Sequence, residues 1–172
     1  MLLYKLGSIL IIFLTISLSG CGFRPLYSKE PYNKKFVNAI ASISVSDIHT
    51  VQGTKFINSL RNTLNPNNIA APTKYILDST LTNIQSYLEL QQDSTVTSYK
   101  TIITVDYKLR DITTNKLIAS GKLQRENNFD KSASEFSTFV SEETANDDAT
   151  EYLAHQLGTI IISSVIKNTT SN

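Results

Sequence analysis

The sequence predicts an α+β fold, a two-layer sandwich with two helices packed on one face of a four-stranded, mainly antiparallel sheet. Three observations support this fold class. Apolar and polar residues alternate along three segments between residues 75 and 123, which is typical of strands covered on one side. Segments 50–64 and 142–166 carry apolar residues at helical spacing. A short β-rich segment precedes the first helix, so the predicted order is β-α-β-β-β-α.

The N-terminal segment has the features of a secretory signal. One positive charge, Lys5, precedes an apolar core over residues 9–18. That core is shorter than the roughly 20 apolar residues that span a bilayer. Two small residues then come directly before Cys21, the chain's only cysteine. This pattern is similar to a bacterial lipoprotein signal and predicts cleavage before Cys21 and acylation of its thiol. The alternatives are an ordinary signal peptide and an uncleaved anchor with a chance cysteine.

Cleavage before Cys21 predicts four parts: a signal peptide (1–20), a lipidated lead-in segment (21–38), a single α+β domain (39–167) and a frayed tail (168–172). The mature chain would have a formal charge near zero, because the signal peptide removes Lys5. Nucleic acid is therefore not an expected partner, since proteins that bind it usually carry a basic excess. The expected membrane link is an anchor of several acyl chains, palmitate among them, because one chain holds only weakly.

The first half of the domain predicts one strand and one helix. The lead-in segment has no clear period, and its apolar residues indicate that part of it packs. Residues 40–46 are β-rich and predict the first strand. A helix is predicted from Thr50 to Leu64 and ends before Pro66, because proline cannot continue it. Its apolar face consists of Phe56, Ile57, Leu60 and Leu64.

Three strands are predicted next. Residues 75–88 alternate with a shift of phase near Asn83, which predicts a bulge or bend there. Residues 99–109 and 117–123 alternate cleanly, and the Asp and Asn residues of 111–115 predict a hairpin turn between them.

The chain is expected to end with a loop over 127–138 and a helix that begins at Glu142 or Ala145 and ends at Ile166. The adjacent Asp147-Asp148 would then stabilise the positive end of this helix. One stripe of the helix is predicted to face the sheet: Ala149, Tyr152, Leu153, Gln156, Leu157, Ile160, Ile161, Ser164 and Val165.

The sequence contains no recognisable catalytic arrangement, so an enzyme, a metal and a cofactor are not expected. It has no nucleophile elbow, no phosphate-binding glycine loop and no H-E-x-x-H motif. The two histidines, His49 and His155, lie far apart in sequence and are expected at a strand-to-helix junction and on the polar side of the last helix.

A basic surface is predicted on the side of the sheet that faces away from the helices. Pairing Arg110 with Lys116 would place Lys108 opposite Ile118 and Thr104 opposite Lys122, so that the even-numbered residues of both strands share one face. Cations among aliphatic side chains suit the headgroups and tails of an anionic amphiphile, or a partner protein. The alternative is an ordinary solvated face. The candidate contact residues are Lys100, Lys108, Arg110, Lys116 and Lys122.

Several segments resemble LptE, the family of lipopolysaccharide-assembly lipoproteins, in its alphaproteobacterial form. The specific motif is Cys21-Gly22-Phe23-Arg24-Pro25-Leu26-Tyr27. Residues 136–143 with the alanines that come after them, and 109–111 with Gly121 beyond the turn, are similar in pattern. The resemblance implies a non-enzymatic plug inside the outer-membrane β-barrel LptD. It also implies lipopolysaccharide as ligand and an acyl anchor on the periplasmic side of the outer membrane.

Two other functions remain open. The chain could be a periplasmic lipoprotein subunit of another envelope transporter or scaffold, which would be recognised by its partner. A lipid-anchored hydrolase is the third hypothesis, and the absence of a nucleophile–base pair in the sequence argues against it.

Overall fold

The structure, a computed structural model, describes residues 31–90 and 96–170. The predicted signal peptide and Cys21 lie outside the described residues. The elements are α2 (Pro31–Ala41), β1 (Ile43–Val45), α3 (Val51–Leu64), β2 (Tyr75–Leu90), β3 (Val96–Asp111), β4 (Leu117–Asp130) and α4 (Glu135–Thr170). The chain divides into two units, Met1–Asn33 and Lys34–Asn172, and all of these elements belong to the second unit except for the first residues of α2. Among the described helices, none combines the length and the hydropathy needed to cross a membrane.

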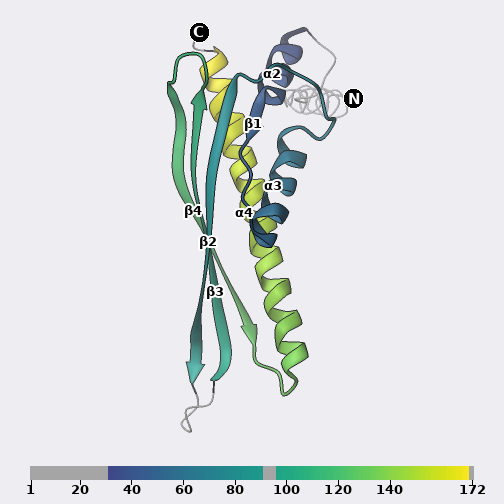
Figure 1. Ribbon diagram of the computed structural model, residues 1–172, viewed down its shortest axis with the longest axis vertical. Coiled ribbons are helices and arrows are strands. Elements are labelled where there is room, and N and C mark those ends of the chain that lie inside the picture. The colour runs from purple at the N-terminus through teal and green to yellow at the C-terminus, as the bar shows by residue number, and fades with distance from the viewer. Residues whose placement is uncertain (1–30, 91–95, 171–172) are drawn as a thin grey trace, which may run out of the picture. The chain divides into compact units, whose positions relative to one another are not determined.

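The four strands form one sheet in the order β1-β2-β3-β4. The short β1 runs parallel to β2, and the two other pairs are antiparallel. Helices α3 and α4 lie together on one side of this sheet (Figure 1). The predicted α+β sandwich with a mainly antiparallel sheet is therefore confirmed, and helix α2 is added to it.

The core lies between the sheet and the two helices. Thr50 caps α3, because its hydroxyl accepts a hydrogen bond from the backbone N–H of Gly53 at 2.9 Å. The apolar residues predicted for α3 are all buried. They meet odd-numbered residues of the two long central strands, and the buried residues of the predicted α4 stripe close the layer. Tyr152 and Gln156 of that stripe are exposed, so the prediction is wrong for these two residues. Fully buried members of this core include Phe56, Leu60, Tyr75, Leu77, Ile103, Val105, Leu109, Leu153, Leu157 and Ile161.

The described part of the lead-in segment, residues 31–38, is helical, which the sequence did not indicate. Helix α2 occupies residues 31–41, so the first strand shrinks from the expected 40–46 to Ile43–Val45. Phe36 and Ile40, one helical turn apart, are both buried and hold this helix to the domain. Two apolar residues at that spacing were too few to predict a helix from the sequence.

The predicted bulge near Asn83 is wrong. Pairing of β2 with β3 runs unbroken from Tyr75 to Tyr87, and the irregularities come after Tyr87. The apolar alternation shifts phase because the polar Asn83 occupies a helix-facing position, whereas the apolar Ile84 is exposed on the opposite side of the sheet.

The last helix is longer than its apolar stripe indicated. It begins at Glu135 and runs to Thr170, while β4 extends to Asp130, so the expected loop over 127–138 shrinks to residues 131–134. The expected frayed tail is helical up to Thr170. Asp147 and Asp148 consequently lie well inside the helix, and the role predicted for them at its positive end is wrong.

Candidate functional site

The side of the sheet away from the helices carries the candidate contact residues, in a register different from the expected one. Lys108 pairs with Ser120 rather than Ile118, and Lys122 pairs with Asp106 rather than Thr104. The shift arises because Arg110 pairs with Leu117 across an irregularity, and the turn closes through a hydrogen bond from the N–H of Asp111 to the carbonyl of Lys116. Even-numbered residues of β3 and β4 still share one face, as predicted. Lys116 lies in the turn and not on a strand.

Charges on this face are balanced. Arg110 pairs with Asp78 at 3.1 Å, Lys122 with Asp106 at 3.4 Å and Lys100 with Glu126 at 3.3 Å, each across neighbouring strands. Such exposed pairs contribute only about 0–1 kcal/mol each to stability, but they neutralise the surface. The expected excess of basic residues on the strands is therefore wrong, because Asp78 and Asp130 also lie on this face.

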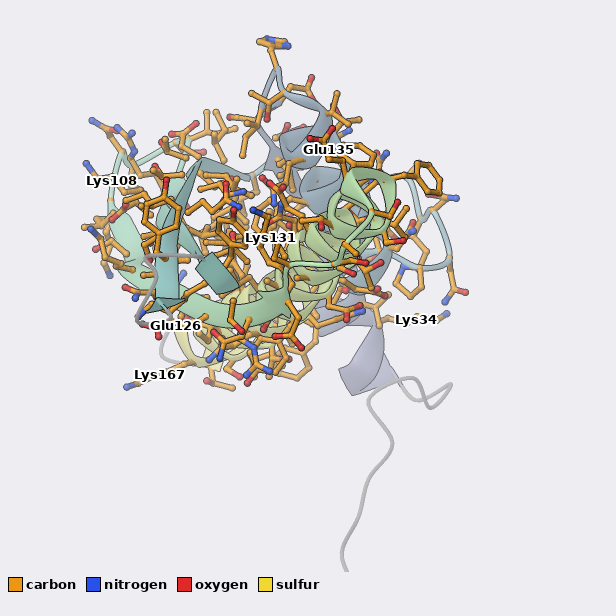
Figure 2. All side chains as sticks on the ribbon, turned by 90° about the horizontal axis from the view of Figure 1, so that it is seen from below. Lys34, Lys108, Glu126, Lys131, Glu135 and Lys167 are labelled. Atoms are coloured by element: carbon orange, nitrogen blue, oxygen red, sulfur yellow. The ribbon has the colours of Figure 1, made fainter. Side chains whose placement is uncertain are left out.

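Lys108 differs from the other cations on this face. It is exposed, and within the described part of the chain it makes no ion pair. Figure 2 shows its side chain pointing away from the helices. It lines a shallow surface depression together with Asp78, Thr80, Asp106, Arg110 and Ser120. The depression offers cations, carboxylates and hydroxyls at one place, which suits a ligand with both anionic and hydroxyl groups.

On the helix side, an exposed ion pair and a close contact connect α3 to α4. The ammonium of Lys55 lies 2.6 Å from a carboxylate oxygen of Asp147 and 3.4 Å from Glu143. The hydrogen bond to Asp147 raises the pKa of Lys55. Further along α4, Gly158 permits close approach of the helices, because a Cβ at this position would lie 2.5 Å from Cγ2 of Thr63.

The two histidines are not brought together. His49 is exposed, and His155 lies on the exposed side of α4, where its Nδ1 is 2.8 Å from the hydroxyl of Thr63. In the described ranges, no group of three His, Cys, Asp or Glu side chains could hold a metal ion.

A partly buried polar network around Thr101 was not predicted from the sequence. The hydroxyl of Thr101 on β3 donates to either of two side-chain oxygens, Asn83 Oδ1 at 2.8 Å on β2 or Asn146 Oδ1 at 2.7 Å on α4. Asn83 also donates to Asn146 at 3.2 Å. The phase shift at Asn83 was the one visible sign of this network.

Beyond this network, apolar side chains are exposed. Phe136 and Phe139, in the first turns of α4, are 75% and 60% exposed, and Val51 at the start of α3 is 79% exposed. On the same side of the sheet, the Tyr87, Tyr99 and Phe129 rings form a row across three strands, with centroids 5.7 and 5.2 Å apart. Phe129 in this row is buried, whereas Tyr87 is 68% exposed. Exposed apolar side chains such as Tyr87, Phe136 and Phe139 are typical of a contact surface.

Comparison with known proteins gives a family and a fold. A family model described as LptE, lipopolysaccharide-assembly, matches residues 40–161. Among curated proteins, none matches the chain significantly in sequence.

Solved structures of low identity share the fold. A putative lipoprotein from Caulobacter crescentus CB15 aligns with a TM-score of 0.60 at 12% identity, over 77% of this chain and 97% of that one. A minor lipoprotein from Acinetobacter baumannii aligns with a TM-score of 0.57 at 17% identity, over 70% of this chain and 90% of that one. Rare lipoprotein B from Shewanella oneidensis aligns with a TM-score of 0.50 at 16% identity, over 75% and 95%.

Proposed function

The chain belongs to the LptE lipopolysaccharide-assembly family, and we propose that it is the non-catalytic lipoprotein partner and plug of an LptD-type outer-membrane β-barrel. In this proposal, acyl chains on Cys21 anchor it to the periplasmic side of the outer membrane, where it assists lipopolysaccharide assembly. The observation that carries the proposal is the family match itself, which covers all four strands, α3 and most of α4.

The balanced face of the sheet supports a place inside a barrel. The lumen of a large outer-membrane barrel is polar. A plug therefore needs a polar surface that does not bring uncompensated charge into the lumen. The three cross-strand ion pairs provide this, since each cation brings its own carboxylate. The exposed Phe136, Phe139 and Val51 add apolar contact area elsewhere on the domain.

A pull-down tests the partner. The acylated protein with a C-terminal tag is recovered from detergent-solubilised outer membranes, and the expected companion is one large β-barrel. The matched control is Cys21→Ala, which keeps the domain but lacks the anchor. Recovery of a transporter complex in place of a barrel would favour the alternative, a lipoprotein subunit of another envelope system.

Lys108 is the leading lipopolysaccharide contact among the five candidates. Lys100, Arg110 and Lys122 are each compensated by a carboxylate, whereas Lys108 has no ion pair in the described residues. Lys116 has none there either, but it lies in the turn and not on the strand face. A phosphate at Lys108 would gain a charge-assisted hydrogen bond without breaking an existing pair.

Lys108→Glu is therefore expected to weaken binding of purified lipopolysaccharide to the full chain. At about 1.5–3 kcal/mol for a charged hydrogen bond, the dissociation constant should rise on the order of tenfold or more. The matched control is Lys131→Glu, the same charge change at an exposed position outside the sheet face. Circular dichroism checks folding. Equal losses in both variants would show that only the overall charge matters.

A further inference from the structure

Five exposed lysines gather at one end of the domain. They come from four segments that are far apart in sequence: α2, the loop before β2, the turn between β3 and β4, and the last turn of α4. Figure 1 shows α2, that turn and the C-terminal end of α4 at the same end of the domain. This basic end consists of Lys34, Lys35, Lys74, Lys116 and Lys167.

Hydrogen bonds hold these segments together. Lys35 donates to the carbonyl of Thr169 at 3.4 Å, which joins α2 to the end of α4. The N–H of Ile112 donates to the carbonyl of Lys74 at 2.9 Å, which joins the turn to the loop before β2. Lys35 and Lys74 line the same surface depression, about 480 Å³ in volume. The lysines therefore act as one surface.

Acidic residues are nearly absent from the basic end. Within the described segments that form it, the one carboxylate is Asp111, which is buried and accepts hydrogen bonds from the N–H groups of Thr113 and Thr114 at 2.9 and 3.0 Å. The opposite end of the domain carries more carboxylates than cations. Residues 126–151 include eight acidic residues and one basic residue, Lys131, and three of these carboxylates pair with cations from other elements, Lys55 and Lys100. The two ends of the domain therefore differ in charge, since the lysines of the basic end face few carboxylates whereas cations elsewhere on the domain are mostly paired.

The chain enters the domain at the basic end. Lys34 comes 13 residues after Cys21, and 13 residues span at most about 45 Å when fully extended. An acyl anchor on Cys21 would keep the basic end within that distance of the membrane.

We propose that the basic end docks on the anionic phospholipid leaflet that holds the acyl anchor. A tethered polybasic surface is attracted to anionic headgroups, and each lysine near the surface favours the docked state about fivefold. In this docked state, which the domain would adopt outside the barrel, the strands point away from the membrane and the opposite end is exposed. This inference rests on the acylation of Cys21 in the proposed function and not on the barrel partner.

The test uses the full acylated chain in vesicles. Because acylation blocks Cys21, one added cysteine can carry a fluorophore, either at the basic end (Thr113→Cys) or in the first turn of α4 (Ser137→Cys). The vesicles contain phosphatidylcholine with or without phosphatidylglycerol, and a headgroup spin label quenches nearby fluorophores. We expect the fluorophore at position 113 to be quenched and the one at position 137 not to be. The quenching at position 113 should require phosphatidylglycerol and should be reversed by high salt.

Two charge-matched variants complete the test. The first variant replaces four lysines of the basic end with glutamine: Lys34, Lys35, Lys74 and Lys116. It should reduce the ratio of docked to undocked protein about fivefold for each lysine removed. The control changes Lys100, Lys108, Lys122 and Lys131 to Gln and should leave the quenching unchanged.

Equal quenching in neutral vesicles, or an equal loss in the control variant, would overturn the inference. Failure of the protein to float with either vesicle would overturn the acyl anchor on which it rests. Loss of the barrel in the pull-down, with docking intact, would count against the plug function alone.

Discussion

Replacing Gly158 with alanine should destabilise this protein, although alanine is the better helix former. At an open position in a helix, the change would stabilise by about 1 kcal/mol. Gly158 is buried where α4 crosses α3. A Cβ there would lie 2.5 Å from Cγ2 and 3.1 Å from Cβ of Thr63, closer than such atoms pack.

Thr63 cannot easily yield. It is β-branched and therefore restricted in χ1 within a helix. Its hydroxyl also donates to the carbonyl of Ser59 at 2.9 Å and lies 2.8 Å from Nδ1 of His155, so a rotation would lose both contacts. Overpacking of this kind costs about 1–3 kcal/mol. Set against the gain in helix propensity, the expected net loss is up to about 2 kcal/mol.

The assay is thermal and urea unfolding of Gly158→Ala in two backgrounds. For a domain of this size, each kcal/mol corresponds to a shift in Tm of roughly 2–4 °C. In a Thr63→Ser background the clashing methyl is absent, so Gly158→Ala should now stabilise by a few tenths to about 1 kcal/mol. The reasoning would be refuted if Gly158→Ala were stabilising with Thr63 present, or if removing the methyl left its effect unchanged.

Three further predictions concern the anchor, the core and the hairpin turn. Cys21→Ala should block processing and acylation, and mass spectrometry of the mature N-terminus checks this; an unmodified Cys21 in the wild type would contradict the anchor. Leu60→Ala and Leu157→Ala should each cost about 2–5 kcal/mol in chemical denaturation, because both side chains are fully buried; losses below about 0.5 kcal/mol at both would contradict the packing. Hydrogen bonds from the N–H groups of Thr114 and Thr113 lower the pKa of Asp111. Its stabilising effect is therefore present above the unfolded pKa of about 3.9 and is lost as the pH falls through the folded value, so the stability difference from Asp111→Asn should shrink below about pH 4.

Much of the fold could be predicted because a strand or helix that is buried on one side has apolar residues at regular intervals in its sequence. The alternation of β3 between 99 and 109 corresponds to its buried odd-numbered residues, and the apolar face of α3 is the one that packs. This apolar pattern does not reveal positions where polar side chains hydrogen-bond to one another between the sheet and the helices. Asn83 on the helix-facing side of β2 and Asn146 on α4 are hydrogen-bonding partners of the buried Thr101, so their segments did not resemble core elements. The N-terminal turns of α4 project beyond α3 and carry few buried residues, which is why the predicted helix began too late.

The candidate site depends more heavily on tertiary structure. The even-numbered positions of Lys108 and Lys122 predicted that both lie on one face of the sheet, which is observed. The predicted pairing of β3 with β4 differed from the observed register by two residues. A register depends on the turn and its irregular pairing near Arg110, and alternation alone is unchanged by a shift of two residues. The cross-strand ion pairs that balance the face depend on that register, so they could not be predicted.

The sequence alone determined the fold class, the faces of the strands and helices, and the resemblance to the LptE family. These properties depend on the local sequence, since the polarity of a residue indicates whether it faces the core or the solvent. Tertiary structure decided which charges meet and which remain uncompensated. It also decided that lysines at positions 34, 35, 74, 116 and 167 form one surface, because only the folded chain brings segments this far apart to the same end. Charge interactions depend on distance in space, and a linear sequence does not record that distance.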